Sequence, residues 1–72
     1  MIGYIKSILP TRSYGFIRCE GKEYFFHRED FSGFWDDLIS DSKLTQIEVE
    51  FDVIPSAKGP RAANVKRTDA PN

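Results

Sequence analysis

Alternating hydrophobic and polar positions predict short β-strands along most of this chain. The clearest case is residues 47–54, where every second residue is apolar and acidic residues fill the positions between them. Alternation with a period of two is typical of a strand with one buried face. Residues 3–9 are rich in β-forming residues and predict another strand, and further strands are predicted at residues 14–19, 22–27 and 62–67.

Turn-forming residues separate these predicted strands. Residues 10–13 predict a turn between the first two strands, and residues 55–60 predict a turn between the last two. The Glu-Gly pair at 20–21 predicts a tight hairpin. The segment 29–46 differs, because its apolar residues recur at helical spacings. We expect a short α-helical or 3₁₀ segment there. Its apolar residues are Phe31, Phe34, Trp35, Leu38 and Ile39.

Five short strands with one helical connection predict an all-β fold, a small closed barrel. Closure pairs the strand edges that would otherwise invite aggregation. A chain of 72 residues is enough for one domain with a single thin core. We expect the barrel to span residues 1–68 and residues 69–72 to form a flexible tail.

Composition points to an ordinary soluble domain without a cofactor. No apolar run approaches the length of a membrane span, and the N-terminal residues lack a signal-peptide pattern, so we expect a cytoplasmic protein without membrane contact. The single cysteine, Cys19, excludes an internal disulfide and fits a reducing compartment. One histidine and one cysteine do not make the usual zinc ligand set. No nucleophile or acid set accompanies His27, so we expect no metal, no cofactor and no enzymatic activity.

Residues 13–30 carry aromatic residues on both faces of the predicted hairpin. Successive side chains of a strand point to opposite faces, so the residues divide into two sets. The first set is compact and suits a core: Ile17, Cys19, Tyr24 and Phe26. The second set combines rings with neighbouring cations and suits a solvated surface: Tyr14, Phe16, Phe25 and His27, flanked by Arg12, Arg18 and Arg28.

The second set indicates binding of single-stranded nucleic acid, because bases stack on exposed rings and phosphates need nearby cations. Gly15, between Tyr14 and Phe16, is expected to keep this surface flat. Two alternatives remain open: the rings pack beneath a loop, or they dock a protein partner or a second copy of the chain. The net charge of −1 is unevenly spread. Basic residues near both ends of the chain are expected to gather on one side, whereas an acidic row repels phosphate: Glu48, Glu50 and Asp52.

Four segments, in order along nearly the whole chain, resemble the cold-shock domain family. "RSYGFI" (12–17) and "EYFFH" (23–27) are similar to its two RNA-binding motifs. "GYIK" (3–6) resembles the family opening Gly-Thr-Val-Lys, and residues 49–65 resemble its final hairpin. The resemblance implies a five-stranded antiparallel Greek-key barrel of the OB type. It also implies binding of single-stranded RNA or DNA, as an RNA chaperone or a regulator of transcription or translation.

The resemblance also implies roles for single residues. It assigns stacking to the four rings of the second set, places Lys6 and Lys58 beside the ligand, and makes Glu23 an acceptor for a base. Arg12 and Arg28 are added for their charge. The nucleic-acid-binding residues expected from the sequence are Lys6, Arg12, Tyr14, Phe16, Phe25, His27, Arg28, Trp35 and Lys58.

Three positions depart from the family pattern. Ser7 stands where the family has a stacking Trp, Arg28 where Phe is frequent, and Ser13 where Gly is usual. We hypothesise that Trp35 or Phe34 supplies the ring that Ser7 lacks. A monomer is expected, with a homodimer formed through the aromatic face as the alternative.

Overall fold

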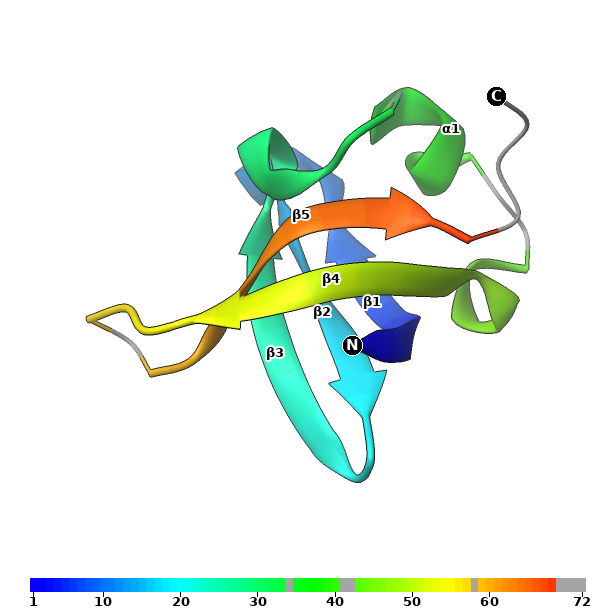
Figure 1. Cartoon of the computed structure of the whole chain (residues 1–72). Coiled ribbons are helices and arrows are strands. Elements are labelled where there is room, and N and C mark those ends of the chain that lie inside the picture. Colours follow the sequence, from blue (N-terminus) through cyan, green and yellow to red (C-terminus); the bar gives the residue numbers. More distant parts are fainter. Residues whose placement is uncertain (34, 41–42, 58, 69–72) are drawn as a thin grey trace.

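Five strands close into a barrel in the order β1-β2-β3-β5-β4 (Figure 1). The computed structural model describes residues 1–33, 35–40, 43–57 and 59–68. Within these ranges the strands are β1 (Ile2–Leu9), β2 (Tyr14–Cys19), β3 (Lys22–His27), β4 (Glu48–Ile54) and β5 (Arg61–Arg67). The predicted five-stranded barrel is therefore confirmed. The contact between β3 and β5 is parallel and pairs Phe25 with Arg61, whereas the other strand pairs are antiparallel.

Short helices fill the connection between β3 and β4, as predicted. They are η2 (Arg28–Asp30), α1 (Trp35–Ile39) and η3 (Leu44–Gln46), and η1 (Pro10–Arg12) joins β1 to β2. In α1 the two buried residues, Trp35 and Leu38, join the core of the barrel. None of the helices in the described ranges is long and apolar enough to cross a membrane.

The core contains the inward set that the hairpin pattern predicted. Ile17, Cys19, Tyr24 and Phe26 are all buried. Each strand contributes to this interior, and the largest fully buried side chains are Phe26, Phe51, Ile5, Ile17, Leu38, Val49 and Val65. Burial of these apolar side chains is the main favourable contribution to folding in so small a domain.

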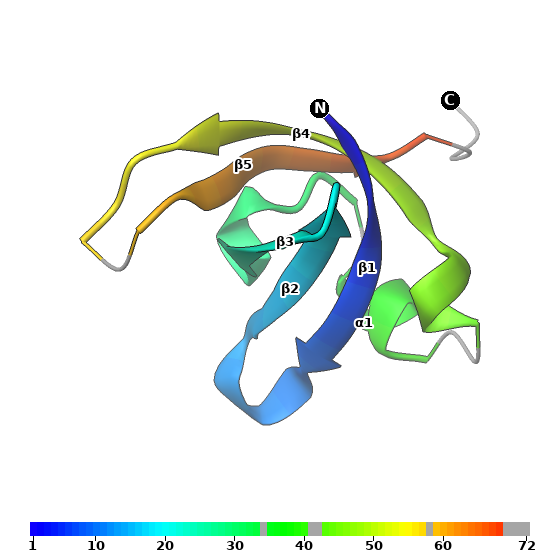
Figure 2. The ribbon, with the colours of Figure 1, turned by 90° about the horizontal axis from the view of Figure 1, so that it is seen from below.

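The predicted apolar face of β4 is correct at its start and wrong at Val53. Val49 and Phe51 are buried, but the side chain of Val53 is 38% exposed. The pairing of β4 with β5 shifts register between Glu50 and Asp52. Beyond this shift the β4–β5 hairpin projects from the barrel, as Figures 1 and 2 show, so Val53 has no core to pack against.

Two turns use left-handed backbone conformations. Glu20 and Gly21 have φ angles of 53° and 79°, the pattern of a two-residue type I′ turn, and the tight hairpin that the Glu-Gly pair predicted is present. Ser13 has a φ of 58°, and its carbonyl accepts a hydrogen bond of 2.8 Å from the backbone N–H of Arg28. Ser13 therefore adopts the left-handed backbone conformation that usually favours Gly. The predicted tail, residues 69–72, lies outside the described residues.

Candidate nucleic-acid interface

The β2–β3 hairpin brings four aromatic side chains together on the outside of the barrel. Tyr14 lies opposite His27, and Phe16 lies opposite Phe25 at the next position of the same face. All four side chains are half-buried. Figure 2 shows β1, β2 and β3 side by side, so this face continues onto β1. We refer to Tyr14, Phe16, Phe25 and His27 as the aromatic surface.

Three rings of the aromatic surface contact one another. The Tyr14 and Phe25 rings are 5.0 Å apart between centroids and tilted by 43°. The Phe16 ring is 5.8 Å from Tyr14 and 6.1 Å from Phe25, with nearly perpendicular planes. Such edge-to-face pairs are favourable beyond the area they bury. Each ring thus restricts its neighbours, and a ligand that stacks here has less side-chain freedom to remove.

His27 is held at the end of β3 by a capping box. Its Nδ1 accepts the backbone N–H of Glu29 at 3.2 Å, and its own backbone N–H donates to Asp30 Oδ2 at 3.0 Å. The other carboxylate oxygen of Asp30 lies 2.8 Å from Nη2 of Arg61. Because Nδ1 accepts a hydrogen bond, the neutral ring carries its proton on Nε2. The network therefore fixes both the position and the tautomer of the His27 ring.

A cluster of charges lies next to the aromatic surface on the same face. Arg18 is opposite Glu23 in the hairpin, and Lys6 of β1 donates to Glu23 Oε2 at 2.8 Å. Arg18 lies farther away, at 3.6 Å from the same oxygen, and its side chain is 60% exposed. The hydrogen bond from Lys6, with the positive charges of both cations, holds the pKa of Glu23 below its ordinary value. The family resemblance assigns Glu23 as an acceptor for a base, and one of its two carboxylate oxygens already accepts a hydrogen bond from Lys6.

Ser7 occupies the β1 position beside Phe16. A register shift between Ile5 and Ser7 marks a β-bulge in β1 at this point. Where the family carries a ring, this chain therefore has a small, half-buried hydroxyl next to the aromatic surface.

The interpretation from the sequence, that Gly15 keeps the outer surface flat, is wrong. Gly15 is buried and faces inward, and an added Cβ would lie 2.7 Å from the Ser7 carbonyl oxygen and 3.1 Å from a Phe26 ring carbon. At 2.7 Å the added Cβ would clash with this backbone oxygen, which cannot move aside as a flexible side chain can. Gly15 is required because β1 packs closely on β2.

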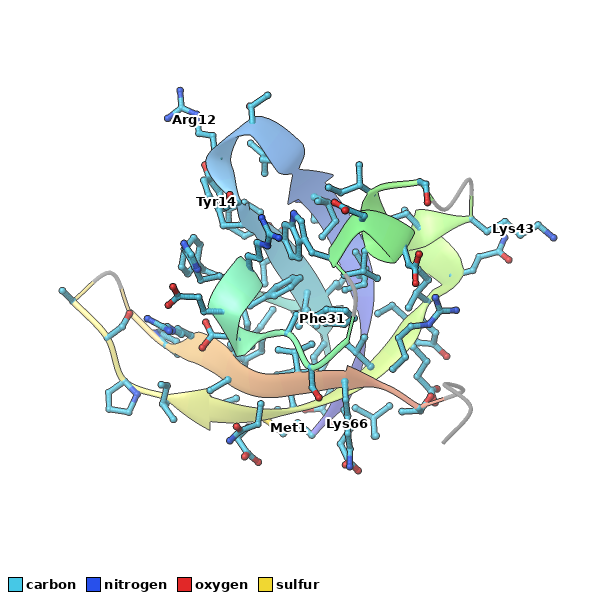
Figure 3. All side chains as sticks on the ribbon, turned by 90° about the horizontal axis from the view of Figure 1, so that it is seen from above. Met1, Arg12, Tyr14, Phe31, Lys43 and Lys66 are labelled. Atoms are coloured by element: carbon cyan, nitrogen blue, oxygen red, sulfur yellow. The ribbon has the colours of Figure 1, made fainter. Side chains whose placement is uncertain are left out.

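The predicted binding cations are only partly brought together. Arg12 and Arg28 are exposed in η1 and η2, which flank the aromatic surface. Figure 3 shows Arg12 projecting from the edge of the molecule near Tyr14, whereas Lys43 projects from the opposite edge. Lys58 and Phe34 lie outside the described residues.

Two of the described basic residues near the C-terminus, Arg61 and Lys66, are paired with acids. Arg61 pairs with Asp30, and Lys66 Nζ lies 3.3 Å from Glu50 Oε1. Arg61 nevertheless borders the aromatic surface, because it is the partner of Phe25 in the β3–β5 contact.

Trp35 is a core residue, which corrects its assignment as a ligand contact. Its side chain is 5% exposed, and its ring lies 5.8 Å from Phe26 and 6.5 Å from Phe31. Figure 3 shows Phe31 over the interior of the barrel rather than at its edge. Helical spacing identified the apolar side of this segment but not that this side closes the barrel. Trp35 therefore does not replace the ring missing at Ser7.

The acidic row is confirmed on the outside of β4, and its members have partners. Glu48 accepts hydrogen bonds from the hydroxyls of Tyr4 and Thr68. Asn64 donates to Asp52 at 3.0 Å, and Glu50 pairs with Lys66. β1 separates this row from the aromatic surface.

Asp30 is the supporting residue that sequence reasoning missed. The spacing of a capping box, His27 followed by an acid three positions later, is a local signal that identifies it. Its contact with Arg61 spans 31 residues and has no such local signal. In the part of the chain that the structure describes, no group of three or more His, Cys, Asp or Glu side chains is arranged to hold a metal ion.

Comparison with known proteins gives one family. The family model described as "'Cold-shock' DNA-binding domain" matches residues 1–68. A search of curated proteins finds no match.

Proposed function

This chain belongs to the cold-shock domain family, a family of nucleic-acid-binding domains, and on this premise we propose that it binds single-stranded RNA or DNA through the aromatic surface. One observation carries the proposal. Four rings lie together on the outside of the barrel, half-exposed, although a domain of this size has apolar material for only one core. Stacking with a ligand that has flat apolar faces explains rings in this position better than a contribution to stability does.

In the proposed complex, successive bases stack on Tyr14, Phe16, Phe25 and His27. Base–aromatic stacking contributes about 1–3 kcal/mol per base and tolerates any sequence. Arg12 and Arg28, which flank the rings, neutralise phosphates and make the affinity salt-dependent. Lys6 contributes positive potential beside Phe16, although Glu23 balances part of its charge.

Binding of this kind supports a role without catalysis. Several weak, sequence-tolerant contacts allow rapid binding and release. A protein that binds only the unpaired form shifts the folding equilibrium of an RNA toward that form by mass action. We therefore propose an RNA chaperone or a regulator of transcription or translation, acting as a monomer in the cytoplasm.

The test is fluorescence anisotropy of labelled oligo-U and oligo-dT, with a duplex of the same length as the control, at low and high salt. The proposal predicts tighter binding to both single strands than to the duplex, and weaker binding at high salt. Equal affinity for duplex and single strand would contradict it, as would the absence of binding at tens of micromolar protein. In that second case, a particle mass that rises with protein concentration would favour the alternative of a dimer interface.

A further inference from the structure

Tyr4 places a fifth exposed ring on the same outer face, one strand away from the aromatic surface. Its neighbours in sequence, Gly3 and Ile5, are buried, so the side chain of Tyr4 points outward, where it is 49% exposed. β1 is the direct neighbour of β2 in the closed barrel. The outer face of β2 therefore continues onto the strand that carries Tyr4, with the β-bulge at Ile5–Ser7 next to it.

The strand register brings Tyr4 close to the aromatic surface. Tyr4 lies opposite Arg18, and Phe16 is two residues from Arg18 on the same face of β2. Tyr4 and Phe16 are thus diagonal neighbours, a relationship that separates Cβ atoms by about 7–8 Å, within reach of aromatic side chains. Lys6 lies between Tyr4 and Ser7 in β1, and its side chain reaches across β2 to Glu23, so cations border the path from Phe16 to Tyr4.

One hydrogen bond orients the Tyr4 side chain, and a second holds its acceptor, Glu48. The Tyr4 hydroxyl donates to Glu48 Oε2 at 3.2 Å, and Thr68 donates to the other oxygen of the same carboxylate at 2.8 Å. The polar end of the ring is thereby engaged on β4. The residue nevertheless stays 49% exposed, and a base requires an accessible ring for stacking.

The charges on the two sides of Tyr4 differ in sign, and this difference favours one path for a bound strand. Arg18 and Lys6 lie on the β2 side of Tyr4, whereas Glu48 and Glu50 lie on its β4 side. Phosphates are favoured on the first side and repelled on the second. A strand that follows the aromatic surface onto β1 therefore ends at Tyr4.

We propose that Tyr4 stacks one further base of the same bound strand and forms the last subsite of the nucleic-acid path, next to Arg18. This inference rests on the proposed function. The resemblance to the family does not supply the ring, because the family opening has Thr where this chain has Tyr4. Arg18, with its largely exposed side chain, meets the phosphate that leads to this base.

The test compares two lengths of labelled oligo-dT, about 4 and about 12 nucleotides, which span part of the range of OB-fold site sizes. Anisotropy titrations use the wild type, Tyr4→Ala, Tyr4→Phe and, as a matched control, Ile2→Ala. Ile2 is an equally exposed apolar residue on the same face of β1, opposite Glu50. Urea unfolding of each variant verifies that it is folded.

The expected result is a loss of affinity of about 5- to 150-fold for the longer strand in Tyr4→Ala, the range of one stacked base. The shorter strand should lose little, because the aromatic surface alone accommodates it. Tyr4→Phe keeps the ring but not its hydrogen bond to Glu48, so it should lose far less affinity than Tyr4→Ala, and Ile2→Ala should match the wild type. Unchanged affinity of Tyr4→Ala for the longer strand, or an equal loss at both lengths, would overturn the subsite.

A fourth variant distinguishes a failure of the Tyr4 subsite from a failure of the proposed function. Phe16→Ala should weaken binding of both lengths. If it does so while Tyr4→Ala has no effect, only the Tyr4 subsite is wrong. If the wild type binds neither length, both proposals are wrong.

Discussion

Ser7 lies directly opposite Phe16 in the pairing of β1 with β2, at a β-bulge beside the aromatic surface. A ring at this position would extend the aromatic surface onto β1. We predict that Ser7→Trp raises the affinity for single-stranded oligonucleotides by about 1–3 kcal/mol, the contribution of one stacked base. Anisotropy titration against the wild type measures the change.

The control for Ser7→Trp is the same substitution combined with Phe16→Ala. If the new ring acts as part of the aromatic surface, its gain should shrink when its neighbour is removed, because contacting residues couple. A Ser7→Trp protein that is folded and binds no better than the wild type would contradict this account of the β1 position.

Trp35 should report on the core and not on the ligand. Since its ring is buried against Phe26 and Phe31, saturating oligonucleotide should leave its fluorescence nearly unchanged while anisotropy records binding. Trp35→Ala should lower the free energy of unfolding by about 3–5 kcal/mol, as expected for a large ring removed from a core. Strong quenching of Trp35 by bound strands, with little loss of stability in the variant, would refute its assignment to the core.

Ser13 has a backbone conformation that favours glycine, with a φ of 58°. We predict that Ser13→Gly raises the free energy of unfolding by about 0.5–1 kcal/mol, because removal of the Cβ strain exceeds the added entropy of the unfolded chain. Gly21→Ala is the opposite control. Its φ is 79° and its Cβ would meet nothing within 4 Å, so only the backbone cost of about 1–2 kcal/mol applies. The prediction fails if urea unfolding shows Ser13→Gly to be destabilised.

Glu23 should make stability depend on acid. Its pKa is lowered in the folded protein, chiefly by the hydrogen bond from Lys6, so its ionised form stabilises the fold. This contribution is fully present above the pKa of Glu23 in the unfolded chain and is lost as the pH falls through the lower pKa of the folded protein. Glu23→Gln should therefore flatten the decline of unfolding free energy in that range.

The variant Lys6→Met tests the Lys6–Glu23 contact at its basic partner. It removes the donor and should flatten the acid dependence in the same way, although the effect is small because the pair is exposed to solvent. A Lys6→Met protein with the full acid dependence of the wild type would show that Lys6 is not the cause.

Local pattern was sufficient for the strands and for the separation of the hairpin into two faces. Alternation with a period of two is a property of the chain itself, so Phe16 and Phe26 could be assigned to opposite sides before the fold was known. The tight hairpin at Glu20 and Gly21 was also predictable, because a Glu-Gly pair between two strands is a local signal.

Other features depend on contacts between distant segments. The burial of Trp35 depends on where α1 meets the barrel, and the exposure of Val53 depends on a register shift between β4 and β5. The requirement for Gly15 comes from the closeness of β1, and the Asp30–Arg61 pair joins residues 31 positions apart. Each of these features depends on residues that are too far apart in the sequence for a local pattern to reveal their contact.

The most direct test of the central claim is the affinity of a labelled single strand for the wild type, Phe16→Ala, Phe25→Ala and the double variant at one low salt concentration. Ile39→Ala, an exposed apolar residue on α1, is the control. We predict that each single variant loses about 1–3 kcal/mol of binding free energy, with less than additive loss in the double variant because the two rings are in contact. Wild-type affinity in a folded double variant would contradict the assignment of the aromatic surface as the binding site.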